Sequence, residues 1–204
     1  MLKIGVTGTI AAGKTSVSIL LKRRGFAVFN SDQYAKMATH HTNPCFEKII
    51  AAFGDDLIDA DGNIDRQKLA DVIFHDENAR LTLNGIVHPY VKQGLLKFFE
   101  RNSDQPAVFA EVPLLFEAGW QELFDHTLVI TCERKTAIER MMRDRDYTEE
   151  EANARYDSQI DMQKQIELAD RVIYNDGSLS DLDHSVNLYI RDLRKEIRHG
   201  NQSL

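Results

Sequence analysis

One short motif near the N-terminus constrains this chain more than any other feature. Residues 8–15 read GTIAAGKT and match G-x-x-x-x-G-K-[ST] at every fixed position. The apolar run Leu2–Thr7 precedes the motif and a helical pattern follows it, which is the strand–loop–helix context that such a loop needs. Backbone N–H groups of the loop surround a phosphate, and the new helix points the positive end of its dipole at the anion. The motif predicts nucleoside triphosphate binding, with Lys14 bridging the β- and γ-phosphates and Thr15 as a ligand of Mg²⁺.

Apolar runs of strand length alternate with helical patterns along the rest of the chain. A helix from Lys14 to about Arg24, ended by Gly25, follows the loop, and another spans Leu179–Ile197. Continuous apolar strands separated by helices are typical of a parallel sheet covered on both faces. The sequence therefore predicts an α/β fold of the P-loop NTPase type with a five-stranded parallel sheet. Its strands are expected at Leu2–Thr7, Phe26–Phe29, Ala107–Val112, His126–Cys132 and Arg171–Tyr174.

Two helical segments interrupt this alternation. Residues 43–102 carry apolar residues at helical spacing, and residues 134–168 are helical and unusually charged. We expect a helical acceptor-binding insertion in the first segment and a lid in the second. Both belong to a single kinase domain whose core comprises residues 1–42, 103–133 and 169–204. A sheet with two helical excursions is what a small-molecule kinase with a substrate-binding cap and a lid would need. This step is an analogy at the level of fold.

Two carboxylates follow predicted strands at the edge of the sheet where a ligand would bind. Asp32 comes just after the second strand, where a carboxylate can orient an acceptor hydroxyl and accept its proton. An equally good interpretation is that Ser31 or Asp32 caps the next helix. Glu111 ends the third strand, as does the acid that holds Mg²⁺ in many phosphate-loop proteins. A charge that simply ends a buried strand explains Glu111 equally well.

Positive charge is concentrated just after the fourth strand, at Arg134, Arg140, Arg143 and Arg145. Arg140 and Arg143 are three residues apart and therefore share a helix face. Arginine side chains can clamp a transferring phosphoryl group because their fork of donors matches its oxygens. A solvated helix surface is the alternative, since acidic residues are interspersed. Beside a phosphate loop, we favour the lid.

Three other motifs do not support a site. Residues 59–63 resemble the start of a calcium loop, but the glycine and glutamate expected further on are missing, so an Asp-Gly turn is predicted. His40 and His41 have no partner at metal-ligand spacing and are expected on the surface. Met141 and Met142 are expected to fill the core.

Motifs spread over the whole chain carry a family resemblance. They are Thr7–Ile10, Asp32, Asp65-Arg66 with Ile73-Phe74, His88-Pro89, Pro113–Glu117, Arg140 and Arg143, Arg155 with Gln159, Ala169-Asp170 and Val172–Gly177. In this order they resemble the dephospho-CoA kinase family. The resemblance implies transfer of the ATP γ-phosphoryl group to the ribose 3′-hydroxyl of 3′-dephospho-CoA, which is the last step of CoA synthesis.

The resemblance also implies roles for individual residues. Asp32 would be the acceptor-orienting base and Lys14 and Arg140 the other catalytic residues. ATP would be bound by Ala11, Ala12, Gly13, Lys14, Thr15 and Ser16, by Arg143 in the lid, and by Asn175 near the adenine. His88, Leu115, Phe116 and Glu117, together with Asp32, would line the acceptor site.

Without the resemblance, some of these residues would be interpreted differently. His88 would be a turn residue before Pro89, and Leu115 and its neighbours would be core. The chain also departs from the family at Thr9 and Ala11, where glycine is common. A Cβ restricts positive φ at those two positions.

Composition limits the partners and the compartment. Lys+Arg 25 against Asp+Glu 32 gives a net charge of −7, which argues against a sequence-independent nucleic-acid binder. No apolar stretch is long enough for a membrane span. Cys45 and Cys132 are far apart in sequence, so no disulfide is expected and the reducing cytoplasm fits. We expect ATP, 3′-dephospho-CoA and Mg²⁺ as ligands of a monomer or weak homo-oligomer.

Two rival functions remain. One is a P-loop kinase acting on a nucleoside, a sugar or a shikimate-like hydroxyl, which acceptor competition would distinguish. The other is a P-loop switch or regulatory ATPase that hydrolyses ATP slowly without an acceptor. The Asn/Thr-Lys-x-Asp run that often reads guanine in such switches is absent.

Overall fold

The computed structural model describes residues 1–200, which form two compact units. The sheet unit comprises Met1–Phe29 and the chain from Asn102 onward, and the helical unit comprises Asn30–Arg101. The helical unit is therefore a single uninterrupted segment, inserted between two parts of the sheet unit. No helix in the described part of the chain is long and apolar enough to cross a membrane.

A five-stranded parallel sheet, in the order β2-β3-β1-β4-β5, is the centre of the sheet unit and confirms the predicted fold class. Its central strand β1 pairs in parallel with β3 on one side, Val6 opposite Glu111, and with β4 on the other, Gly8 opposite Ile130. The predicted strands are all present, with ends that differ by at most one residue. They are β1 (Leu2–Gly8), β2 (Ala27–Asn30), β3 (Ala107–Glu111), β4 (His126–Thr131) and β5 (Arg171–Tyr174).

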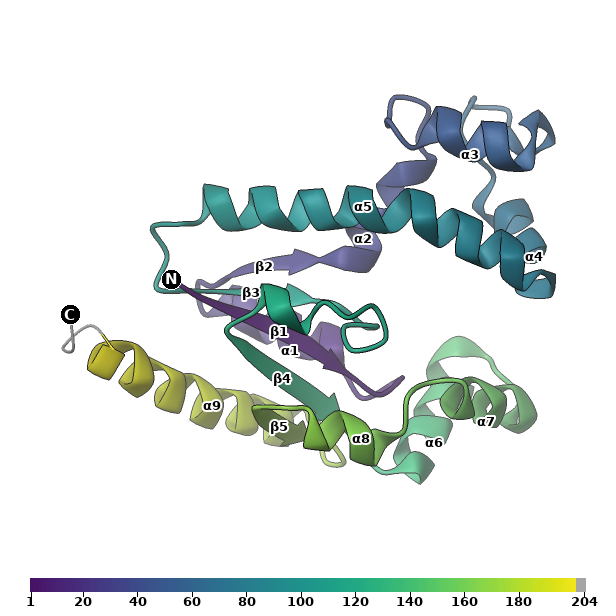
Figure 1. Ribbon diagram of the computed structural model, residues 1–204. Coiled ribbons are helices and arrows are strands. Elements are labelled where there is room, and N and C mark those ends of the chain that lie inside the picture. Colours follow the sequence, from purple (N-terminus) through teal and green to yellow (C-terminus); the bar gives the residue numbers. More distant parts are fainter. Residues whose placement is uncertain (201–204) are drawn as a thin grey trace. The chain divides into compact units, whose positions relative to one another are not determined.

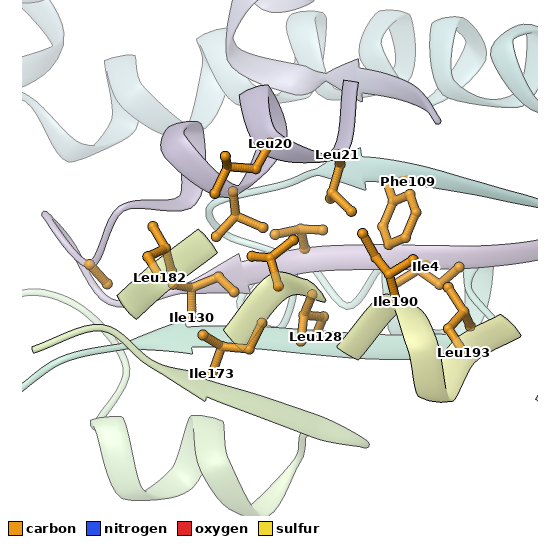
Figure 2. Packing of buried hydrophobic residues seen from close by; sticks show 14 of the residues in the cluster. Ile4, Leu20, Leu21, Phe109, Leu128, Ile130, Ile173, Leu182, Ile190 and Leu193 are labelled. Carbon is orange, nitrogen blue, oxygen red and sulfur yellow. The ribbon is translucent and has the colours of Figure 1, made fainter. Parts of the chain in front are cut away.

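Helices α1 (Lys14–Arg23) and α9 (Leu179–Gly200) pack against this sheet and against each other. Figure 2 shows leucine and isoleucine side chains of both helices meeting those of the strands in one continuous apolar layer. Each fully buried side chain of this size contributes about 1.5–3 kcal/mol. The layer fixes the end of β1 and the start of α1, between which the glycine-rich loop runs. Its labelled members include Ile4, Leu20, Leu21, Phe109, Leu128, Ile130, Leu182 and Ile190.

The charged segment after β4 forms the helices α6 (Arg134–Arg145), α7 (Glu149–Asp157) and α8 (Met162–Glu167). Helices α6 and α7 share a small core around Met141 and Ala152, against which Ile10 of the loop also packs. A capping box at the start of α7 fixes the turn between them. Met141 is fully buried, as predicted, but Met142 is 42% exposed, so the prediction of core for Met142 is wrong. One helix face holds only one of two consecutive residues.

The helical unit has a core of its own, drawn from each of its longer helices. Tyr34 lies so close to Gly94 that a Cβ there would be 2.3 Å from its ring. Figure 1 shows the course of these elements. In chain order they are α2 (Ser31–Lys36), η1 (Met37–Thr39), α3 (Phe46–Phe53), η2 (Asp55–Leu57), α4 (Arg66–His75) and α5 (Glu77–Arg101).

Three local expectations concern this unit. The Asp-Gly turn is confirmed, because Asp59 accepts hydrogen bonds from the backbone N–H groups of Asp61 and Asn63, 2.9 Å each. His40 and His41 are exposed, as predicted. The turn interpretation of His88 is wrong, since His88 and Pro89 lie inside α5. Proline removes one backbone donor, but α5 runs unbroken through its 25 residues and packs against both α2 and α4.

Candidate phosphate-binding site

The loop between β1 and α1 has the backbone conformation of an anion-binding nest. Gly13, the N-cap of α1, has φ 95° and ψ 24°, in the left-handed region that glycine tolerates best. A Cβ at Gly13 would lie 2.5 Å from Nδ2 of Asn175, so space as well as conformation requires glycine. The loop therefore delivers the unpaired N–H groups of the first turn of α1 to one point.

Ala11 also has a positive φ, of 57°. The predicted restriction therefore applies at Ala11, where an L-residue in this conformation costs about 1–2 kcal/mol relative to the right-handed region. Thr9 has no positive φ, because Ala11 and Asp146 are the two non-glycine residues of the described chain that do. The strain is confined to one residue of the loop.

Three side chains from distant parts of the sequence hold the loop in this shape. Gln159, between α7 and α8, accepts a hydrogen bond from the backbone N–H of Ile10 at 2.6 Å. Arg140 of α6 donates from Nη1 to the carbonyl of Ala11 at 3.3 Å. Asn175, just after β5, donates from Nδ2 to the carbonyl of Ala12 at 2.8 Å. These contacts pair backbone groups in the loop and restrain its strained conformation.

A cavity of about 230 Å³ lies beside the loop. The ammonium of Lys14 donates to the carbonyls of Gly8 and Thr9, 2.8 Å each, and so lies across the loop. Its positive charge and the end of the α1 dipole make this cavity suited to a phosphate chain. The residues that line it are Ala11, Gly13, Lys14, Thr15, Ser16, Arg140, Asp144 and Arg145.

A buried carboxylate lies next to the start of α1. Glu111, at the end of β3, is 4% exposed and accepts hydrogen bonds from the hydroxyls of Thr15 (3.1 Å) and Ser18 (2.7 Å). Carboxylate and hydroxyl oxygens are the hard ligands that Mg²⁺ prefers. Among the described residues, no group of three or more His, Cys, Asp or Glu could hold a metal ion. The oxygens of Thr15 and Glu111 fit Mg²⁺, which usually completes its coordination shell with water and substrate phosphates.

The arginines after β4 contact different partners. Arg140 is half-buried and contacts the loop, as described above. Arg143 is 71% exposed and forms a two-pronged ion pair with Asp144, whose pKa it lowers. Arg145 lines the phosphate cavity although Arg143 does not. Arg134 pairs with Asp157 near the start of α6. Arg140 and Arg145 are thus the two that the structure brings to the loop.

Asp32 lies in the first turn of α2, with its side chain exposed. The cap of this helix is Asn30, whose side chain accepts from the backbone N–H of Gln33 at 2.8 Å. The alternative in which Ser31 or Asp32 caps α2 is therefore wrong. The cap lies one residue earlier because β2 ends at Asn30 and α2 begins directly after it.

The other residues expected on the acceptor side differ in exposure. Leu115 is fully buried, 2.5 Å from where a Cβ on Gly5 would lie, and its contact with the acceptor stays a prediction from the family resemblance. Phe116 is half-buried and Glu117 is exposed. His88 is half-buried, and burial lowers the pKa of its imidazole.

Three residues of this site have contacts that the sequence patterns do not assign. Gln159 was noticed only as part of a family motif, and no local pattern connects it with Ile10. Ser18 could have been found, because it lies one helical turn after Thr15 and both reach Glu111. Arg145 was grouped with the other arginines, and only the course of α6 distinguishes it.

Comparison with known proteins gives one consistent family. The family model described as dephospho-CoA kinase matches residues 2–181. A dephospho-CoA kinase of Bacillus cereus is 36% identical over 191 residues, 93% of this chain and 96% of the relative. A solved structure from Thermus thermophilus is 31% identical with a TM-score of 0.81, over 94% of this chain and 97% of the other. Dephospho-CoA kinase from Campylobacter jejuni is 28% identical with a TM-score of 0.73, over 95% and 98%.

Proposed function

This chain belongs to the dephospho-CoA kinase family, and from that premise we propose how its residues transfer the ATP γ-phosphoryl group to the ribose 3′-hydroxyl of 3′-dephospho-CoA. It is an ATP-dependent kinase of the last step of CoA synthesis. The observation that carries the assignment is the family match across both units, together with an intact phosphate loop.

ATP binds, in this proposal, with its phosphate chain against the loop residues Ala11–Ser16. The N–H groups of the first turn of α1 and the ammonium of Lys14 hold the β- and γ-phosphates. Arg140, already on the carbonyl of Ala11, moves a short distance to the γ-phosphoryl oxygens and stabilises the charge that develops there. Arg143 joins it only if its ion pair with Asp144 opens.

Asn175 supports the nucleotide through the loop. Its amide holds the carbonyl of Ala12 at 2.8 Å, and its side chain is 7% exposed. We therefore assign it to fixing the loop beneath ATP, and a contact with the adenine remains a prediction from the family resemblance.

Mg²⁺ is proposed to bind at the oxygens of Thr15 and Glu111. The hydroxyl of Thr15 would be a direct ligand, and the carboxylate of Glu111 would hold the ion directly or through water. Held there, Mg²⁺ would supply positive charge that neutralises the β- and γ-phosphates. The hydrogen bond from the Thr15 hydroxyl to Glu111 holds these two oxygens 3.1 Å apart, which supports the proposal.

On the acceptor side, Asp32 is proposed to accept a hydrogen bond from the 3′-hydroxyl. Because Asn30 caps α2, the carboxylate of Asp32 is not needed as the helix cap. The hydroxyl oxygen forms a bond to the γ-phosphorus while the bond to the β–γ bridging oxygen breaks, and the hydroxyl proton passes to Asp32 late in the step. Phe116, Glu117 and His88 stay predicted acceptor contacts.

Two further points concern the setting of the reaction. Both cysteines are free and buried, which fits a reducing compartment, and we propose that the enzyme works in the cytoplasm. A monomer or weak homo-oligomer that binds no nucleic acid stays the prediction.

A mass-resolved phosphorylation assay tests this function. Purified protein is incubated with ATP and Mg²⁺ and with 3′-dephospho-CoA, adenosine, shikimate, pantothenate or no acceptor, while ADP release and product mass are followed. We expect phosphate on 3′-dephospho-CoA in preference to every other acceptor. Transfer mainly to shikimate or pantothenate would contradict the proposed acceptor. ADP release equal to that without an acceptor would contradict the kinase.

A further inference from the structure

A cavity of about 280 Å³ lies in the sheet unit, away from the phosphate loop. Phe26 and Pro106 in its wall directly precede β2 and β3, whereas the loop follows the carboxyl end of β1. Because the strands are parallel, the cavity and the loop lie at opposite ends of the sheet. Helix α1 spans the distance between them, about 15 Å for its 10 residues. The residues that line the cavity are Arg24, Gly25, Phe26, Gln105, Pro106, Arg194, Ile197 and Arg198.

Positive charge dominates this cavity. Within the described part of the chain, its wall contains three arginines and no carboxylate, although the protein has a net charge of −7. We infer that the cavity binds a small anion through a phosphate or diphosphate group. The planar fork of a guanidinium matches phosphate oxygens with paired N–H donors, which makes arginine well suited to this ligand. The inference is independent of the proposed phosphoryl transfer, which uses none of these residues.

The first reason is the pairing of charges along α9. Arg191 and Lys195 both form ion pairs with Asp192. Among the described residues, no carboxylate lies at ion-pair distance from Arg194 or Arg198. The positive charges of this stretch of α9 that lack an acidic partner are therefore the two that line the cavity.

The second reason is the spacing of these two arginines. Arg198 follows Arg194 by four residues, so both lie on one face of α9 with Cβ atoms about 5–6 Å apart. Like charges at this spacing destabilise a helix, whereas an anion between them would replace repulsion by attraction. Arg198 lies in the last turn, where a positive charge also favours the helix dipole. Arg194 precedes that turn, so the dipole does not account for it.

The third reason is that two of the three guanidinium groups are held in place. Arg24 donates three hydrogen bonds, the shortest to Asp183 at 2.7 Å, and a guanidinium has five N–H donors. The guanidinium carbon of Arg194 lies 6.0 Å from the centroid of the Phe26 ring, in a cation–π contact. Side chains restrained in this way lose less rotamer freedom when a ligand binds. Because Asp183 compensates the charge of Arg24, the net charge of the wall comes from Arg194 and Arg198.

The size of the cavity limits the ligand. About 280 Å³ lies just below the usual range of small-molecule pockets, so a whole nucleotide would not fit inside. The wall also supplies the half-buried amide of Gln105, whose Nε2 makes a long contact of 3.5 Å with Asp104. This amide can donate a further hydrogen bond to an anion. The ligand therefore presents one or two phosphate groups, either as a free anion or at the end of a larger molecule that extends into solvent.

Calorimetric titration of the whole protein with pyrophosphate, without nucleotide or Mg²⁺, tests the inference. The phosphate loop also binds such an anion, so wild type should show two sites, and Lys14→Met should weaken the one at the loop. Arg194→Gln and Arg198→Gln should each weaken the other site about tenfold or more, because a charged hydrogen bond is lost. They should leave the affinity of the loop site within twofold. Titration with inorganic phosphate and with ribose 5-phosphate then distinguishes a free anion from an organic phosphate, by which of the two binds more tightly.

Arg191→Gln is the matched control, because it removes the same charge from the same helix, whereas Arg191 pairs with Asp192 and does not line the cavity. It should change the affinity of neither site by more than twofold. An equal loss in Arg191→Gln would show general attraction to a basic helix instead of a site, and would overturn the inference. So would pyrophosphate affinities that stay within twofold of wild type in both Arg194→Gln and Arg198→Gln. A wild type with no site beyond the one that Lys14→Met weakens would overturn it as well.

Discussion

At the scale of single residues, Asp32 carries the most specific prediction. Asp32→Asn keeps the shape of the side chain and removes its ability to take a proton. We expect kcat to fall by about 10²-fold or more, whereas the KM for ATP should change less than threefold, because the phosphate loop is untouched. Steady-state kinetics with ATP and 3′-dephospho-CoA varied in turn make the measurement. Equal losses in turnover and in ATP affinity would show a structural role instead.

Gln159 carries a second prediction, about the shape of the loop. Gln159→Met removes the acceptor for the N–H of Ile10 but keeps the volume of the side chain. Loss of this bond weakens the restraint on the strained backbone at Ala11, so the KM for ATP should rise about three- to tenfold. The KM for 3′-dephospho-CoA should stay unchanged.

Two further variants sharpen this test. Gln163→Met alters an exposed glutamine on α8 and should leave both constants as they are. Gln159→Glu keeps an acceptor oxygen but adds negative charge near the triphosphate, so it should weaken ATP binding more at low ionic strength than at high. If Gln159→Met leaves the KM for ATP unaltered, Gln159 does not contribute to nucleotide binding.

The phosphate loop could be predicted from sequence because its chemistry is local. Eight consecutive residues carry the motif, and each fixed position has a steric or electrostatic reason. The contacts that hold the loop could not be predicted, since Gln159 and Asn175 reach it from 149 and 163 residues away. The apolar run around Leu115 predicts core by itself, and the structure buries Leu115 completely beside Gly5.

At the scale of elements, one carboxylate joins the starts of β4 and β5. Asp170 accepts from the backbone N–H of Thr127 at 2.7 Å and from its hydroxyl at 2.8 Å. Asp170→Ala leaves both donors of the buried Thr127 without this partner, and the free energy of unfolding at pH 7 should fall by about 1–3 kcal/mol. Asp104→Ala, at an exposed loop position, is the control and should change it by less than about 0.5 kcal/mol.

The hydrogen bonds between Asp170 and Thr127 predict that the free energy of unfolding depends on pH. Partial burial alone would raise the pKa of Asp170, but the hydrogen bonds from Thr127 outweigh burial and hold that pKa below its usual range. The unfolded chain then binds the proton at higher pH than the folded protein does. The stabilisation is thus present above about pH 4 and is lost as pH falls through the folded pKa. Urea unfolding at several pH values should show wild type and Asp170→Ala converging below about pH 4, and a constant difference down to pH 2 would contradict this account.

Helices and strands were predicted to different degrees. The strands could be predicted because each is a short run rich in apolar residues, and their ends differ by at most one residue. The central strands β1, β3 and β4 are largely buried, whereas the edge strands β2 and β5 are only partly buried. The middle of α5 could not, since the pair His88-Pro89 favours a turn in isolation, and the helix persists through its packing against α2 and α4. The cap of α2 was placed one or two residues late, because three consecutive residues, Asn30, Ser31 and Asp32, are all good caps.

At the scale of the whole molecule, the two units have cores that can be weakened separately. Ile49 in the helical unit and Leu21 in the sheet unit are both fully buried. Replacement of either by alanine should cost about 2–5 kcal/mol. Hydrogen exchange followed by mass spectrometry should show faster exchange of α3 to α5 for Ile49→Ala and of β1, β4 and α9 for Leu21→Ala.

The two variants also serve as controls for each other. Saturating ATP should slow exchange in the sheet unit of Ile49→Ala as much as in wild type, because the phosphate loop lies in that unit. If either variant speeds hydrogen exchange equally in both units, the molecule unfolds as one cooperative block.

The place of β1 in the sheet has a consequence for synthesis on the ribosome. This strand is made first, yet it lies between β3 and β4, which begin at Ala107 and His126. At ordinary translation speeds, its hydrogen-bonding edges wait roughly 5–20 s for the first partner to be made. During that interval the contiguous segment Asn30–Arg101 emerges complete and can collapse by itself. The helical unit is therefore complete before β1 can pair, and the phosphate loop gains its last contacts only after Asn175 has been made.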